Sequence, residues 1–295
     1  MIAERRGARP KSVNMDAAEA PAVAGPLSIK EFLDVGYLQC ADVILARNEW
    51  SLSSWIIRQA TDSNFAHAAM IFLQPERPYG WRSTYLIESV FAGVDVTDLD
   101  DYFTLPRASV AVKRLNRDWF DDALRRRVRS RMLDDIKAEY DFPTMLRLGR
   151  QALFGVQRML LGHKRAVLRR HAKGLDAPKE FICSGFIQSG YVRAFTQLVG
   201  EGRVPASGFG DVIFDAEIRK RLRLDDSGRA EADRAQEVQR LVGQVQSELL
   251  AVTPRDIELH EAFDWVYVLT GGKAYPVHGG YAEVCELLQC RPVNR

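Results

Sequence analysis

The sequence predicts an α+β protein in which an antiparallel sheet packs against a helix that begins at Cys183. Two patterns support this prediction. Before residue 114, short apolar runs of strand length alternate with turn residues, as is typical of antiparallel sheets. After Trp119, apolar residues recur at steps of three and four, as on one face of a helix.

The first half of the chain is expected to supply most of the sheet. A short leading helix or turn is predicted over residues 27–38, starting near Ser28 and ending at Gly36. A helix over residues 51–60 has Ser51 as its N-terminal cap and an apolar stripe formed by Leu52, Trp55, Ile56 and Gln59. Strands are predicted over residues 40–46, 65–73, 83–91, 93–97 and 109–113.

The second half is expected to be mainly helical, with helices over residues 121–139, after Cys183, over 218–251 around a loop, and from Thr253. Residues 211–214 are predicted as a short strand and residues 263–269 as the final one. These elements make one domain over residues 28–270, with a helical insertion at about 119–175. Residues 1–27 are expected to be disordered, and residues 271–295 to form a C-terminal tail.

Composition and charge exclude several classes of protein. The 295-residue chain carries a net charge of +2 and has no run of about 20 apolar residues that could span a membrane. Its N-terminus does not resemble a secretory signal, and four cysteines in a chain of this length do not indicate a disulfide framework. A cytoplasmic location is therefore expected, with export by a route without a cleaved signal left open.

Residues 142–175 contain basic and apolar residues but no acidic residue. Such a segment favours an anionic membrane surface or an acidic partner, and equally a helical hairpin that packs on the core with a solvated basic face. Nucleic acid is an improbable partner because few aromatic residues lie among the basic ones to stack on bases.

Cys183 is the candidate nucleophile, because the first turn of a helix favours thiolate over thiol. A nucleophilic cysteine needs a base, and the base needs an orienting group. His67 is a lone polar residue in an apolar strand, and Glu88 is a lone acid in the next strand. If those strands form a hairpin, the carboxylate can fix the imidazole tautomer. The alternative is a buried structural pair, with Cys183 as a packing residue.

The residues then resemble a family, the permuted NlpC-like papain-fold cysteine hydrolases of the YiiX type, more distantly related to lecithin:retinol acyltransferase. The resemblance is carried by Asp42-Val-Ile-Leu, Asn64-Phe-Ala-His67, Leu86-Ile-Glu88-Ser, Gly93-Val94, Cys183-Ser184, Tyr140-Asp141 and Thr253-Pro-Arg-Asp256. In that group the histidine strand precedes the cysteine helix, as it does in this chain. Three positions depart from the group's usual residues: Ala41 replaces Gly, Ala66 replaces Ser, and Gly185 replaces an acidic residue.

The resemblance implies a papain-like fold and a cysteine hydrolase or acyltransferase that acts on a peptide- or lipid-linked acyl group. Cys183 would be the nucleophile, His67 the general base and then acid, and Glu88 the residue that orients His67. Asp42, Ser184 and Tyr140 would be supporting residues. No metal or other cofactor is expected, since His278, Cys285 and Cys290 match no standard zinc spacing. The rival function is a non-catalytic module that docks acidic partners or a membrane surface.

Overall fold

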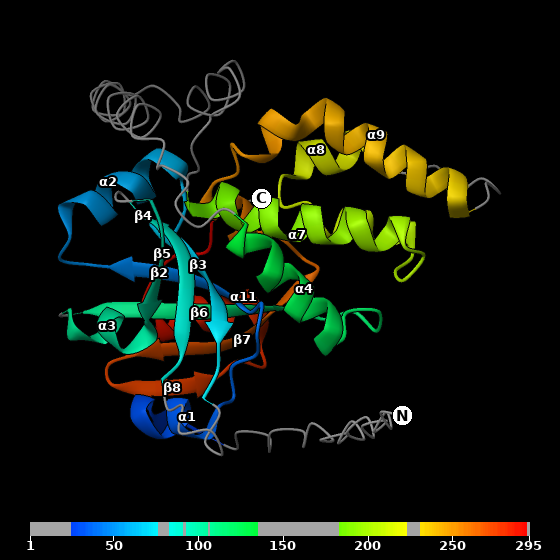
Figure 1. Cartoon of the computed structure of the whole chain (residues 1–295). Helices are drawn as coiled ribbons and strands as arrows, with labels where there is room; N and C mark the ends of the chain where they lie inside the picture. Colours follow the sequence, from blue (N-terminus) through cyan, green and yellow to red (C-terminus); the bar gives the residue numbers. More distant parts are fainter. Residues whose placement is uncertain are drawn as a thin grey trace, which may run out of the picture.

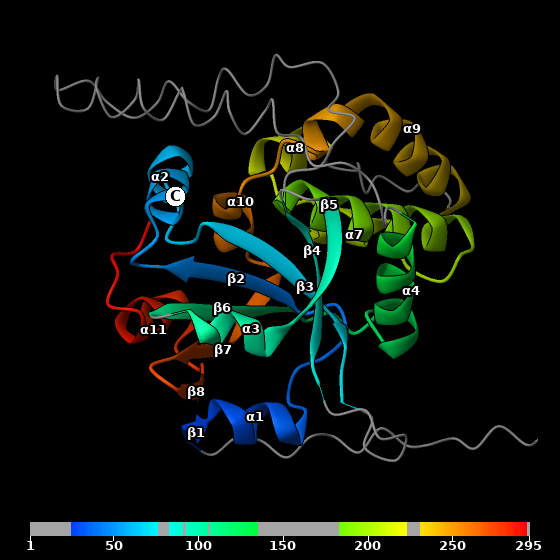
Figure 2. The same ribbon diagram turned by 60° about the vertical axis from the view of Figure 1, so that its left-hand side comes forward.

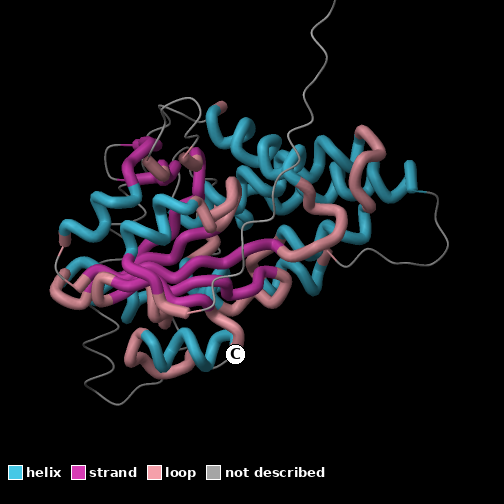
Figure 3. Tube along the Cα trace, turned by 90° about the horizontal axis from the view of Figure 1, so that it is seen from below, coloured by secondary structure: helices cyan, strands magenta, loops and turns pink. Residues whose placement is uncertain are grey.

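The protein is described from a computed structural model, which covers residues 25–75, 83–90, 93–105, 107–134, 183–222 and 231–293. It has an α+β architecture in which helices lie on both sides of one antiparallel sheet (Figures 1 and 3). Tyr140, the basic segment 142–175 and nearly all of the expected disordered segment 1–27 lie outside the described residues.

In the described ranges the sheet has eight strands, in the order β1-β8-β7-β6-β2-β3-β4-β5, and every neighbouring pair is antiparallel. The strands are β1 Leu27–Ser28, β2 Val43–Asn48, β3 His67–Leu73, β4 Tyr85–Val90, β5 Gly93–Asp98, β6 Ala108–Leu115, β7 Phe263–Thr270 and β8 Lys273–Pro276. All five strands predicted in the first half of the chain are present, with ends shifted by up to three residues.

The helices are α1 Ile29–Val35, α2 Leu52–Thr61, α3 Leu99–Thr104, α4 Asp122–Leu133, α7 Cys183–Gly200, the 3₁₀ helix η4 Ala206–Val212, α8 Ala216–Arg221, α9 Glu231–Leu249, α10 Pro254–Glu258 and α11 Gly280–Leu287. Three N-termini follow the sequence signals closely. Ser28 and Glu31 form a capping box on α1, and Thr253 and Asp256 form one on α10. Ser51 caps α2 through the Ser54 amide.

The sheet is buried on both faces. One face carries a large cluster that includes Leu45 and Met70, and α7 and α11 pack there through residues such as Phe186 and Val284; α9 packs in turn on α7. The opposite face carries a smaller cluster, to which α1 and α3 contribute Phe32 and Leu99. Figure 2 shows α7 and α4 beside the end of the sheet where β3, β4 and β5 lie. The helix that begins at Cys183 is therefore a core element.

The predicted strand at 211–214 is wrong, because residues 206–212 form η4. The side chain of Gln188 in α7 explains the difference. It donates to the Val212 carbonyl at 2.6 Å and accepts from the Phe214 amide at 2.6 Å. These backbone groups are thus satisfied without a partner strand.

The predicted boundary at residue 270 is also wrong, because the supposed tail belongs to the fold. Gly271 and Gly272, both at positive φ, make a tight turn after β7, so that β8 pairs back on it. Helix α11 then packs against β7. Helix α3, over residues 99–104, was not predicted at all.

Within the described ranges, no helix has both the length and the apolar character needed to cross a bilayer.

Candidate active site

Cys183 is the first residue of α7, and its residue surface is 7% exposed. Burial alone would raise the pKa of its thiol. The charge of His67, a hydrogen bond with the His67 ring and the backbone amides of Ala68 and Ser184 outweigh burial and lower this pKa. These are the contacts that a nucleophilic thiolate requires.

His67 lies at the first position of β3, between Cys183 and Glu88. Its Nε2 is 2.5 Å from Oε2 of Glu88, and the ring also hydrogen-bonds the thiol. Burial would lower the pKa of His67, but the Cys183 thiolate and the bonds to Cys183 and Glu88 raise it to about 10. These opposite shifts favour a thiolate–imidazolium pair, with the Glu88 carboxylate on the other side of the ring.

Glu88 is 3% exposed, yet its carboxylate is ionised because three side chains donate to it. His67 and Tyr102 contact Oε2, and Thr97 contacts Oε1. Burial would raise the pKa of Glu88, but the hydrogen bond and charge of His67, with the bonds from Thr97 and Tyr102, lower it to about 2. The predicted pairing of the three residues is thus present in the structure.

Thr97 and Tyr102 were not predicted as site residues. Thr97 is on β5, which pairs with the Glu88 strand, and Tyr102 is on the unpredicted helix α3. The Tyr102 ring also stacks beside His67, with the ring centroids 6.4 Å apart. A usable signal was present: Asp98 followed by Asp100 and Asp101 is a helix N-terminus pattern, and Asp98 does cap α3.

Ser184, predicted as a supporting residue, anchors the cysteine helix. Its Oγ donates to the carbonyl of Val252 at 2.5 Å. The next residue, Gly185, lies against the same segment, and a Cβ there would be 2.1 Å from the Leu250 carbonyl oxygen. The missing acidic side chain at position 185 thus has a steric reason, because no side chain fits between α7 and residue 250.

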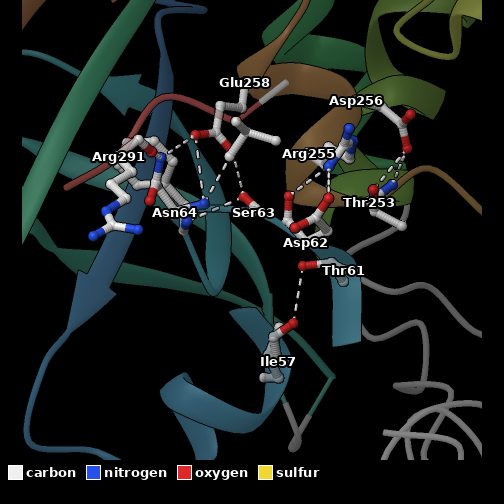
Figure 4. A network of polar contacts seen from close by, with 12 residues as sticks. Ile57, Thr61, Asp62, Ser63, Asn64, Thr253, Arg255, Asp256, Glu258 and Arg291 are labelled. Carbon is white, nitrogen blue, oxygen red and sulfur yellow. Dashed lines mark hydrogen bonds and ion pairs between the residues drawn. The ribbon is translucent and has the colours of Figure 1, made fainter. Parts of the chain in front are cut away.

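The segment 250–258 also holds the chain that leads into His67 (Figure 4). Glu258 accepts hydrogen bonds from Ser63 Oγ at 2.6 Å and from the Asn64 amide at 3.1 Å. Arg255 donates to the backbone carbonyl of Asp62 at 2.8 Å. We call this set of contacts the α10 brace. It fixes the start of α7 and the approach to β3 to one short segment.

Lys113 binds the C-terminal end of α10 and so holds the α10 brace in place. Its Nζ donates to the carbonyls of Ile257, Glu258 and His260 at 2.9, 3.0 and 2.7 Å, and it lies 4.6 Å from the centre of the Trp265 ring. Burial lowers the pKa of Lys113 to about 7. A cation at the C-terminal end of a helix satisfies carbonyls that lack intrahelical partners.

Asp42 shapes a turn and does not contact the triad formed by Cys183, His67 and Glu88. Its fully buried carboxylate accepts two hydrogen bonds from the Arg114 guanidinium, at 2.7 and 2.8 Å, and one from the Gln39 backbone amide at 2.7 Å. The preceding Ala41 has a φ of +66°, in the left-handed region that favours glycine. The Gly expected at this position from the resemblance therefore corresponds to a real conformational requirement.

The other candidate groups have different surroundings. His260 is buried, donates from Nε2 to Ile213 and accepts at Nδ1 from Ala262; burial and nearby cations lower its pKa well below the usual value. The Cys285 and Cys290 thiols hydrogen-bond each other. Among the described residues, no three His, Cys, Asp or Glu side chains gather as a metal site.

The sequence matches no protein-family model and no curated protein. The chemical interpretation therefore depends on the geometry of this chain. Nucleophilic acyl transfer needs a thiol with a lowered pKa, a histidine in contact with that thiol, and an ionised carboxylate in contact with the histidine. This site has all three.

Proposed function

We propose that this protein is a cysteine hydrolase or acyltransferase that cleaves an amide, ester or thioester through an acyl-enzyme. The observation that carries the proposal is the continuous contact from Cys183 through His67 to Glu88. We propose further that the α+β fold is a permuted papain-like one. The order of histidine strand, glutamate strand and cysteine helix along the chain supports this, as does the packing of the sheet against that helix.

In the first half-reaction the Cys183 thiolate attacks the acyl carbon and forms a carbon–sulfur bond. The oxygen of the tetrahedral intermediate takes up the negative charge, and the Cys183 backbone amide, at the helix start, is a natural donor to it. As the bond to the leaving group breaks, His67 gives its proton to the departing nitrogen, oxygen or sulfur. Glu88 keeps the imidazole aligned throughout.

In the second half-reaction His67 is neutral and acts as the base. It takes a proton from water, or from an acceptor alcohol or amine, as that molecule attacks the thioester. The carbon–sulfur bond then breaks and returns the thiolate, while the product carries the acyl group. Peptide-linked and lipid-linked acyl groups are both compatible with these steps.

Alkylation with iodoacetamide at mildly acidic pH tests the nucleophile. Burial raises the pKa of Cys40 to about 11 and that of Cys285 to about 12, so these thiols should react slowly. We expect site-resolved mass spectrometry to find Cys183 modified first. Cys40→Ala is the matched control and should keep the wild-type rate. Wild-type labelling no faster than that of Cys183→Ala would sink the proposal.

The second candidate is a binding module that keeps the fold without catalysis. It is favoured by the acid-free sequence 142–175, which suits acidic partners or an anionic membrane surface. This candidate predicts that Cys183→Ala leaves the biological phenotype intact, whereas the hydrolase proposal predicts its loss. An activated ester that adds one acyl mass to the wild type but not to Cys183→Ala would favour the enzyme.

A further inference from the structure

The apolar stripe of helix α2 is exposed at Leu52 and Trp55, whereas Ile56 and Gln59 are half-buried. The sequence predicted Leu52, Trp55, Ile56 and Gln59 on one face, as for a helix packed on a core. In the structure Leu52 is 71% exposed and Trp55 is 40% exposed, and Trp50, just before the helix, is 66% exposed. The one buried residue of α2 is Ser54, whose Oγ accepts from the Asn48 amide at 3.2 Å.

Trp50, Leu52 and Trp55 are hereafter called the tryptophan face. Two exposed tryptophans and a leucine so close together are unusual, because large apolar groups lose favourable burial when they face water. By contrast, the exposed Val35 and Leu133 stand on separate helices, α1 and α4. The tryptophan face is therefore a candidate contact surface, and the charged residues around it indicate the class of partner.

The charges around the tryptophan face favour an anionic partner. Helix α2 contains no acidic residue, and its one charged side chain is Arg58. The exposed Arg107 places its guanidinium 4.9 Å from the centre of the Trp50 ring. The nearest acid in sequence, Glu49, is held by Arg47 at 2.6 Å. Aromatic rings beside an exposed arginine match the headgroup region of an anionic bilayer.

The tryptophan face is connected to the candidate active site. The C-terminal cap of α2 is Asp62, which Arg255 of the α10 brace holds. Three residues before Arg255 is Val252, the acceptor for Ser184 next to the nucleophile. Five residues after Asp62 the chain reaches His67. Helix α2 is thus connected, through Asp62 and Arg255, to the segments that position Cys183 and His67.

We propose that the tryptophan face docks the protein on an anionic phospholipid surface and so presents the site to membrane-borne acyl substrates. Trp50 and Trp55 insert at headgroup level, Leu52 enters the acyl boundary, and Arg107 meets lipid phosphate. The docking does not need catalysis, whereas the choice of lipid-linked substrate rests on the proposed hydrolase function.

Vesicle flotation of the full chain carrying Cys183→Ala tests the docking apart from catalysis. The probes are phosphatidylcholine vesicles with and without phosphatidylserine. We expect binding to the mixed vesicles and a loss of at least about tenfold in Trp50→Ala/Trp55→Ala, because interfacial affinity scales with the apolar area inserted. The matched control is Val35→Ala/Leu133→Ala, which removes exposed apolar residues elsewhere and should bind like its parent. Brominated lipids should quench tryptophan fluorescence in the parent and less in the double variant.

Three results would overturn the docking proposal, and a fourth would overturn only the substrate assignment that rests on the proposed function. Equal flotation of the parent and the Trp50/Trp55 variant would place membrane binding elsewhere on the chain. No flotation by the parent, with dimers on gel filtration that the double variant loses, would assign the tryptophan face to a second copy. Flotation only after residues 142–175 are replaced by a neutral linker would show that the chain's own segment covers it. A protein that docks but hydrolyses no ester would keep the docking and lose the substrate assignment.

Discussion

Two buried glutamates in this protein each accept several hydrogen bonds, and their different partners give them different roles. Glu88 faces His67, a group that changes its charge, with Thr97 and Tyr102 as neutral supports. In the described part of the chain, the Glu258 carboxylate accepts from the neutral donors of Ser63, Asn64 and Tyr281. Glu88 acts directly on the pKa of the candidate base His67, whereas Glu258 acts on the pKa of groups outside the site, Tyr281 and Lys113, and holds the chain before His67 in position. Isosteric substitutions of the two should therefore differ in kind as well as in size.

Glu88→Gln should have the larger effect of the two, a fall in kcat/KM of about 10²-fold or more. The hydrogen bond and charge of Glu88 are among the causes that raise the pKa of His67, so their loss lowers that pKa. The basic limb of the pH–rate profile then moves down from about pH 10. A less stable imidazolium also raises the Cys183 pKa, so the acidic limb moves up. A narrowed profile checks this, and an unchanged one would contradict the orienting role.

Glu258→Gln should lower kcat/KM less, by about tenfold, through a small displacement of the chain before His67. It should also reduce the free energy of unfolding by about 1–3 kcal/mol, since buried donors lose a charged acceptor. Both limbs of the pH–rate profile should stay where they are in the wild type. A shift of either limb as large as that of Glu88→Gln would erase the distinction between the two glutamates.

Gly185→Ala tests the close packing between the start of α7 and the segment that leads into the α10 brace. The added Cβ would lie 2.1 Å from the Leu250 carbonyl oxygen, which is backbone and yields little. We expect a loss of about 1–3 kcal/mol in the free energy of unfolding, measured by urea denaturation. The matched control is Gly243→Ala on α9, where nothing lies within 4 Å of the new Cβ and stability should rise. Equal effects at both positions would contradict tight packing at 185.

The triad could be predicted because each member breaks a local pattern. A lone histidine, a lone glutamate and a helix-start cysteine each stood out from apolar surroundings, and their pairing needed only one hairpin and one helix. Glu258, Ser63 and Lys113 could not be found in this way. Ser63 lies in an ordinary turn sequence and Lys113 at the end of an apolar run, and their contacts join positions 144 to 195 residues apart. The exposure of Leu52 and Trp55 on α2 shows the same limit, because periodicity gives a stripe without its direction.

The turn at Ala41 gives the smallest expected effect and the clearest sign. Ala41 has a φ of +66°, and its carbonyl accepts the Tyr191 hydroxyl of the cysteine helix. Ala41→Gly removes the left-handed strain at some entropic cost, so we expect a gain of about 0.5–1 kcal/mol in the free energy of unfolding. Ala60→Gly, inside α2, should instead lose about 1 kcal/mol. Because residue 41 belongs to the frame, the pH–rate profile of Ala41→Gly should match the wild type. A destabilised Ala41→Gly protein would mean that the alanine methyl group contributes more by packing than its backbone strain costs.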